Sequence, residues 1–182
     1  MTTDTPFSNR PGADQGAYVS ALLELLGERD PLEVLAATPG EVRRALEGVP
    51  EAELRRPEAP GKWSRLQVAA HLADSEVAIA WRLRLTIAQD RPPLTGYDQD
   101  AWAERLGYAN ADLGQVLEVF EVLRAANVRL LRRLAPADWE RVAVHAERGE
   151  ESVRHMTRLF AGHDLLHLRQ IERIRRAVDA GG

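Results

Sequence analysis

This 182-residue chain contains two histidines four residues apart, His163 and His167, whose residue type and spacing suit the binding of a metal ion. Residues four apart on a helix lie on nearly the same face, so both imidazoles would point the same way. The pair continues an apolar line through Met156 and Phe160, which predicts that the rings face the interior. Buried imidazoles are costly unless their lone pairs are used, and a divalent metal ion uses them directly. An accidental gathering of histidines on one helix face is the alternative.

A third metal ligand must come from another helix, and His71 is the best candidate. The chain contains no cysteine, which excludes a thiolate site. His71 lies among small and apolar residues, in the stretch Val68–Ala73. Three histidines leave coordination positions open for water or substrate, as in catalytic rather than structural zinc sites. For His71 an ordinary, partly buried histidine remains the alternative, and His145 and His155 look ordinary.

Three polar residues near these positions need an interpretation. Asp164 follows the first histidine of the pair where zinc proteases carry a catalytic glutamate, and its shorter side chain argues against a protease. Arg82 lies almost three helical turns after His71, on the same face, where it could contact an anionic group of a small-molecule substrate. Reaching solvent is the alternative for Arg82. Asn127 interrupts an apolar stripe, which favours a hydrogen bond within the core over a contact to a metal-bound ligand.

Helices must position these residues, and several sequence patterns mark where helices begin. Capping boxes open helices at Ser64 and Asp112, and Ser152 caps the last one. Thr38 followed by Pro39 also has the pattern of a helix start. The expected helices are 18–26, which ends at Gly27, and 38–47, 64–88, 112–134 and 152–178. His71 then lies on the second helix of a bundle, and the histidine pair lies on the last.

The segments between the expected helices differ in length and composition. Residues 48–61 contain three prolines and are expected to form a loop. Residues 89–111 form a long connection with a helical turn around 99–105, a length that suits a crossing of the bundle or the lining of a site. Residues 140–150 suggest a short extended segment. Residues 1–15 are expected to be a disordered tail and 16–182 a single domain, an all-α four-helix bundle.

Composition excludes several classes of function. The formal net charge is -4 and arginine is spread along the chain, so no basic patch for nucleic acid is expected. No stretch approaches the roughly 18 apolar residues of a membrane span, and the N-terminus lacks the pattern of a signal peptide. We therefore expect a soluble, cytoplasmic protein that binds neither nucleic acid nor membrane.

Taken together, the spaced motifs of this chain resemble the DinB/YfiT-like superfamily from about Thr38 to the C-terminus. No single one of these motifs would be specific, but several occur in the expected order. The matching elements are Gly61-Lys62-Trp63-Ser64, Gln67 to Glu76, Tyr97-Asp98 with Trp102, Asp138-Trp139, His145, and His163-x-x-x-His167.

The resemblance implies a fold, a metal site and an activity. The fold would be a bundle whose helices run up, down, down and up, with 89–111 crossing between the second and third. The metal would be zinc or nickel on His71, His163 and His167. Family members include metal-dependent hydrolases and thiol transferases or isomerases that use bacillithiol, mycothiol or glutathione, and many are homodimers. Ala161 and Asp164 stand where one branch of the family has further histidines, so roles of those histidines do not transfer.

The leading functional hypothesis is a metal-dependent enzyme, a thiol-dependent S-transferase or a hydrolase. A bound cation favours the anionic form of a thiol or water and so makes a nucleophile at neutral pH. A non-catalytic, metal-binding stress-response protein is the alternative. A plain helical interaction module without a metal is the third hypothesis.

Overall fold

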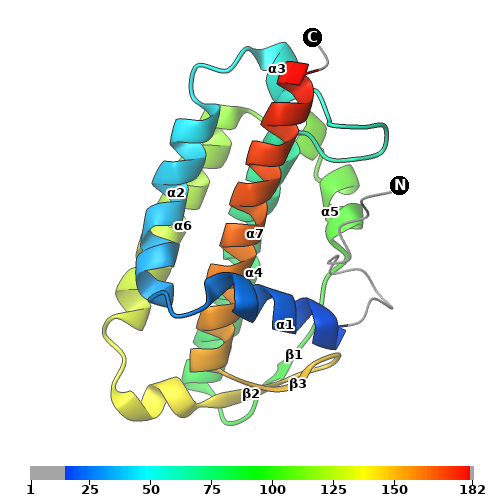
Figure 1. Cartoon of the computed structure of the whole chain (residues 1–182). Coiled ribbons are helices and arrows are strands. Elements are labelled where there is room, and N and C mark those ends of the chain that lie inside the picture. The colour runs from blue at the N-terminus through cyan, green and yellow to red at the C-terminus, as the bar shows by residue number, and fades with distance from the viewer. Residues whose placement is uncertain (1–14, 181–182) are drawn as a thin grey trace.

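Four long helices form a bundle in the computed structural model of this chain, which describes residues 15–180. Figure 1 shows that two of them run in one direction and two in the other, in the order up, down, down, up. This confirms the predicted all-α class and topology, including the long crossover between the second and third bundle helices. The bundle helices are α2 (Pro31–Leu46), α4 (Arg65–Ala88), α6 (Leu113–Leu131) and α7 (Val153–Ala180).

Shorter elements fill the segments between and before these helices. The helical turn predicted at 99–105 is confirmed as α5, whereas the predicted loop 48–61 contains the four-residue helix α3. The disordered tail was predicted for residues 1–15. Residues 1–14 lie outside the described residues, and α1 begins at residue 15. The shorter elements are α1 (Gln15–Leu26), α3 (Glu51–Leu54), β1 (Pro93–Leu94), α5 (Gln99–Arg105), η1 (Tyr108–Asn110), η2 (Pro136–Glu140), β2 (Val142–His145) and β3 (Gly149–Ser152).

Side-chain caps start three of the bundle helices, including the two that carry the histidines. At α4, the Ser64 hydroxyl accepts from the Gln67 amide at 3.3 Å, and the Gln67 side chain accepts from the Ser64 amide at 2.9 Å. At α6, the Asp112 carboxylate accepts from the Gln115 amide at 2.9 Å. At α7, the Ser152 hydroxyl accepts a backbone N–H three residues on. All three predicted starts are confirmed because each cap satisfies amides that the helix itself leaves free.

The predicted start of α2 at Thr38 is wrong, because the residue that caps this helix lies eight residues earlier. The Asp30 carboxylate caps it, and Pro39 lies inside the helix. A proline within a helix leaves the carbonyl four residues before it without its usual N–H partner. Here that carbonyl belongs to Leu35, and the Arg124 guanidinium of α6 donates to it at 2.7 Å. A side chain from another helix thus replaces the missing bond and allows α2 to continue.

A small sheet closes one end of the bundle. Strand β2 pairs with β3 in an antiparallel hairpin, with Val142 opposite Ser152 and His145 opposite Gly149. On its other edge β2 pairs in parallel with β1, which belongs to the crossover. The extended segment predicted at 140–150 is therefore a hairpin. Its turn carries Arg148, and β3 leads directly into α7.

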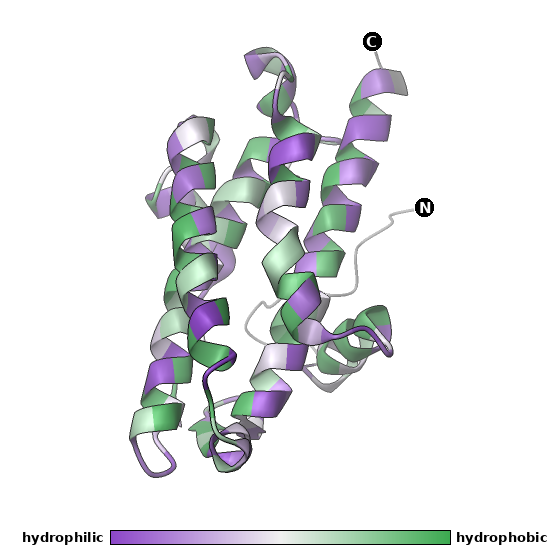
Figure 2. Ribbon diagram, turned by 90° about the vertical axis from the view of Figure 1, so that its left-hand side faces the viewer, coloured by the Kyte–Doolittle hydropathy of each residue, from purple (hydrophilic) through white to green (hydrophobic). Residues whose placement is uncertain are grey.

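The long helices are amphipathic, and their apolar faces meet inside the bundle. Figure 2 shows hydrophilic and hydrophobic residues alternating around each long helix. Helix α1 packs across α7, where a Cβ at Gly162 would lie 2.2 Å from the Leu22 carbonyl oxygen. Only glycine allows this approach.

None of the helices formed by the described residues has both the length and the apolarity that a membrane crossing requires. The largest core cluster contains Val42, Leu46, Leu54, Leu66, Val68, Ala69, Leu72, Ala73, Leu117, Phe120, Ile171, Ile174 and Val178.

Candidate metal centre

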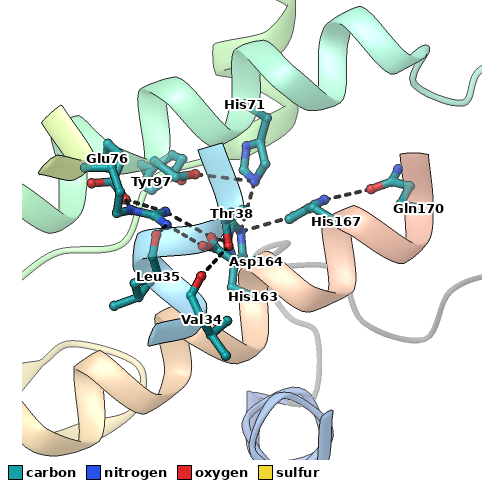
Figure 3. A network of polar contacts seen from close by, with 12 residues as sticks. Val34, Leu35, Thr38, His71, Glu76, Tyr97, His163, Asp164, His167 and Gln170 are labelled. Carbon is teal, nitrogen blue, oxygen red and sulfur yellow. Dashed lines mark hydrogen bonds and ion pairs between the residues drawn. The ribbon is translucent and has the colours of Figure 1, made fainter. Parts of the chain in front are cut away.

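Three imidazoles from two helices meet inside the bundle. Figure 3 shows the ring of His71 extending from α4 toward the rings of His163 and His167, which extend from α7. The Nε2 atom of His163 lies 3.1 Å from Nε2 of His71 and 3.1 Å from Nε2 of His167. The three candidate ligand atoms all lie within 4.8 Å of one another. The structure therefore brings together the three histidines predicted from the sequence.

The two separations of 3.1 Å fit a single metal ion. Two nitrogens that bind one ion tetrahedrally at about 2.0–2.1 Å are about 3.3 Å apart. A neutral imidazole carries one N–H and one lone pair, so three ring nitrogens that meet at one point cannot all satisfy each other. A cation resolves this because each Nε2 can then offer its lone pair. Three imidazole nitrogens without a thiolate suit zinc, nickel or copper better than magnesium or calcium.

An outer contact orients one of the three rings. The Nδ1 atom of His167 lies 2.7 Å from the side-chain oxygen of Gln170, one helical turn further along α7. An amide oxygen accepts hydrogen bonds, so this contact assigns the ring proton to Nδ1 and leaves the Nε2 lone pair directed at the cluster. Metal-binding histidines in proteins usually have such a partner. The Nδ1 atom of His163 lies 4.0 Å from Asp164.

Burial keeps the histidines neutral, which is the form that binds metal. His71 is 1% exposed and His167 is 7% exposed. Burial, together with the neighbouring histidines, lowers the pKa of His71 well below its usual value of 6.5. Burial and His163 lower the pKa of His167 to about 3. Both rings are therefore unprotonated near neutral pH, and a cation entering the cluster need not displace their protons.

The lowered pKa of His167 predicts how stability changes with pH in the metal-free protein. The unfolded chain protonates this residue near pH 6.5, whereas the folded chain does so only near pH 3. Below pH 6.5 the unfolded state binds the extra proton, so the free energy of unfolding should fall by about 1.4 kcal/mol per pH unit from this residue alone. Urea unfolding after chelation, at pH 7 and pH 5, measures this. His167→Gln should lose that part of the slope, and equal slopes would contradict the assignment.

A pocket opens beside the cluster, with a volume of about 610 Å³ including its mouth. His71 and His163 form part of its wall. Arg82 and Ser75 also line it, so the sequence prediction that Arg82 lies on the same face of α4 as His71 agrees with their positions. The other lining residues are Tyr18, Val19, Leu22, Tyr97, Gln99, Arg148, Met156, Leu159 and Phe160.

Two hydroxyl groups connect the histidines with the crossover segment. The Ser75 hydroxyl lies 3.4 Å from Nε2 of His71 and 3.1 Å from the Tyr97 hydroxyl. Burial raises the pKa of Tyr97, so its phenol keeps its proton at neutral pH. Tyr97 can therefore donate a hydrogen bond next to the cluster. The long crossover thus lines the site, as its length had suggested.

A buried ion-pair network, which sequence reasoning missed, lies behind the cluster. The Arg124 guanidinium pairs with Glu76 of α4 at 2.7 Å and with Asp164 of α7 at 2.5 Å. Burial favours the neutral form of Asp164, but Arg124 outweighs it and lowers the pKa of that carboxyl. Asn127 donates to the other carboxylate oxygen of Glu76 at 2.8 Å. This confirms the hydrogen bond within the core that was expected for Asn127. Asp164, which stands where one branch of the family has a histidine, is another member of the network.

The other two histidines take no part in the cluster. His145 is buried in β2, where its Nδ1 accepts from the Glu147 amide at 3.2 Å. Burial and the nearby Arg148 lower the pKa of His145 to about 4. His155 lies near the start of α7 and is half-buried. Neither histidine belongs to the cluster of His71, His163 and His167.

Comparison with known proteins relates this chain to one family. The sequence profile of the DinB superfamily matches residues 35–171. A candidate metal-dependent hydrolase of Oceanobacillus iheyensis is 37% identical over 111 residues, which cover 61% of this chain and 64% of that protein. The candidate metal-dependent hydrolase YfiT of Bacillus subtilis is 27% identical over 148 residues, which cover 81% of this chain and 83% of that protein. The aligned region thus spans just under two thirds of the first relative.

A solved structure shares the fold over nearly the whole chain. It is the structure of YfiT from Bacillus subtilis, whose description names an unusual four-helix bundle topology. The two structures match with a TM-score of 0.76 at 23% identity, over 93% of each chain. At this identity the likeness supports the topology, and the function must be argued from the site.

Proposed function

The chain belongs to the DinB superfamily, and we propose that it is a metal-dependent enzyme whose His71, His163 and His167 hold one divalent transition-metal ion. The observation that carries this proposal is the meeting of three Nε2 atoms from two helices. The names of the relatives as candidate metal-dependent hydrolases support it. Zinc and nickel are the ions that we propose, since imidazole nitrogens suit both.

The reaction that we propose is thiol-dependent S-transfer or hydrolysis of a small molecule. When bound, a divalent ion favours the deprotonated, nucleophilic form of a thiol or water at neutral pH. Bacillithiol, mycothiol or glutathione would serve as the thiol. The protein's own groups position the reactants: the Tyr97 phenol can donate a proton or hydrogen bond near His71. Arg82, in the same pocket wall, offers a cation for an anionic substrate group.

We also propose a cytoplasmic homodimer, on the basis of the sequence expectation. Two exposed apolar side chains of α4 support a contact with a second copy. Trp81 is 64% exposed and Val77 is 50% exposed, and they lie one helical turn apart. Sedimentation equilibrium of the purified protein would distinguish a dimer from a monomer.

Removal of the metal should stop turnover. The purified protein should contain close to one equivalent of zinc or nickel, and chelation should abolish the activity that it shows, either hydrolysis of ester substrates or conjugation of one of the three thiols with electrophiles. Addition of zinc or nickel should restore the activity, because the histidines remain folded around the site. Elemental analysis followed by this activity screen is the measurement. Stoichiometric metal without turnover in any assay would contradict the enzymatic proposal and favour the non-catalytic, metal-binding protein.

A further inference from the structure

Two arginines project into the pocket beside the metal centre, and they suggest what kind of molecule enters it. Arg82 comes from α4 and Arg148 from the turn of the β2–β3 hairpin. None of the described residues that line the pocket is an aspartate or a glutamate. Most of the remaining wall is apolar, with Val19, Leu22, Met156, Leu159 and Phe160. The pocket therefore combines positive charge with an apolar surface.

Arg82 is a buried cation that forms no direct ion pair among the described residues, although the charges of Glu151 and Glu147 act on it from further away. The residue is only 7% exposed, and none of the carboxylates in residues 15–180 forms an ion pair with it. Its Nη2 donates to the Thr95 carbonyl at 2.7 Å, and its guanidinium carbon lies 5.9 Å from the centre of the Tyr97 ring. These contacts hold the side chain in place but do not neutralise its charge. A buried charge without a direct ion pair is costly, so an anion that reaches it would be bound favourably.

Arg148 is held rigidly next to this cation. Its Nε and Nη2 bind the two carboxylate oxygens of Glu151 at 2.6 and 3.0 Å, and Glu151 is 1% exposed. This pair neutralises one arginine and fixes its plane. Burial, followed by the charge of Arg148, lowers the pKa of Arg82, while the charges of Glu151 and Glu147 act in the opposite direction. Both arginines line the same pocket, and Arg82 is the one that no carboxylate of residues 15–180 pairs with directly.

We propose that Arg82 and Arg148 form an anion subsite, and that the substrate of the metal centre is an organic anion with an apolar body. Its carboxylate or phosphate group would bind between the two guanidinium groups, and its apolar part would lie against the aliphatic and aromatic wall. Guanidinium groups bind both kinds of oxyanion in charge-assisted hydrogen bonds. The proposal rests on the proposed function for the reaction itself, but the anion subsite can be tested without turnover.

Isothermal titration calorimetry with three eight-carbon probes tests the subsite. Octanoate, octyl phosphate and octanol share the apolar chain and differ in the head group. Both anions should bind at least about tenfold more tightly than octanol, because each adds charge-assisted hydrogen bonds to the arginines. The tighter of the two anions identifies the preferred group. Titrations are run on the protein as purified and again after chelation, and the preference should persist after chelation because it comes from the arginines.

Variants of each arginine test whether they cause the preference. Arg82→Gln, and Arg148→Gln combined with Glu151→Gln so that no lone carboxylate stays buried, should each weaken the binding of the anions toward that of octanol. Octanol binding should stay the same, which shows that the pocket is folded. Arg154→Gln is the matched control, since Arg154 pairs with Glu140 on the surface at 2.7 Å. This control variant should leave the affinities for all three probes unchanged.

Three results would overturn the anion subsite. They are equal affinity for octanoate and octanol, unchanged anion binding in both pocket variants, and loss of the preference on chelation, which would mean that the anion binds the ion. Failure of the proposed function looks different. A protein that holds no metal would still prefer the anions, whereas a metal-binding protein without the preference would keep its metal.

Discussion

Replacement of Arg124 by methionine should lower the free energy of unfolding by about 3–5 kcal/mol, the usual effect of breaking a buried ion pair from one side. The arginine is 2% exposed and binds carboxylates of two other helices. Methionine of similar length would leave Glu76, Asp164 and the Leu35 carbonyl buried without this partner. Two uncompensated carboxylates in the core are expected to dominate the effect. Urea unfolding at pH 7 measures it.

A surface ion pair that also involves α6 provides the matched control. Arg43 of α2 pairs with Glu121 of α6 at 2.6 Å, with both side chains 38% exposed. Arg43→Met should cost no more than about 1 kcal/mol, because solvent screens exposed pairs. Addition of Glu76→Gln to Arg124→Met should recover part of the loss. Equal effects of the two arginine variants would contradict the role assigned to the buried network.

The second large effect is expected at the metal centre. His163→Ala removes the imidazole that lies 3.1 Å from both of the others, so two nitrogens remain. Metal affinity should fall by more than the about 10–100-fold that loss of an outer contact costs. Gln170→Leu, which removes that outer contact from His167, should fall within the smaller range. Competition titrations with a chromophoric chelator measure both affinities.

A histidine elsewhere on the same helix controls for the number of imidazoles in α7. His155 lies eight residues before His163, outside the cluster. His155→Ala should leave the metal affinity and stoichiometry unchanged. If His163→Ala also left the metal content unchanged, the chain would fit the third hypothesis, a helical interaction module without this metal site.

The histidine cluster could be predicted because its signals are local. Capping patterns fixed where α4 and α7 begin, and the spacing of His163 and His167 follows from helical geometry. His71 needed a guess about which helices face each other, which a single sequence does not specify. The resemblance to the family indicated that the helix of His71 faces the helix of His163 and His167.

The start of α2 could not be predicted because the reason that it differs is not local. Thr38 and Pro39 have the pattern of a helix start, whereas the true cap is Asp30. The helix continues through Pro39 because Arg124, 89 residues away from Leu35 in the sequence, donates a hydrogen bond to the Leu35 carbonyl. Contacts between distant segments override local propensity in this way.

The pocket and the buried network were missed for the same reason. Arg148 belongs to a hairpin turn that the sequence marked only as extended, and its role depends on α4 and α7 lying beside it. Arg124 looked like one of many helix arginines. Only Asn127, a polar residue in an apolar stripe, indicated that polar groups are buried there. A polar residue on the core face of a helix is therefore the signal that could have led to its partners.

Anomalous diffraction from crystals grown with zinc or nickel tests the central claim most directly. Data collected on both sides of the absorption edge of the metal locate the ion without any assumption about activity. We expect one peak, about 2.0–2.1 Å from the Nε2 atoms of His71, His163 and His167. Absence of a peak at this point, or a peak that contacts only one of the three rings, would contradict the assignment of a metal centre.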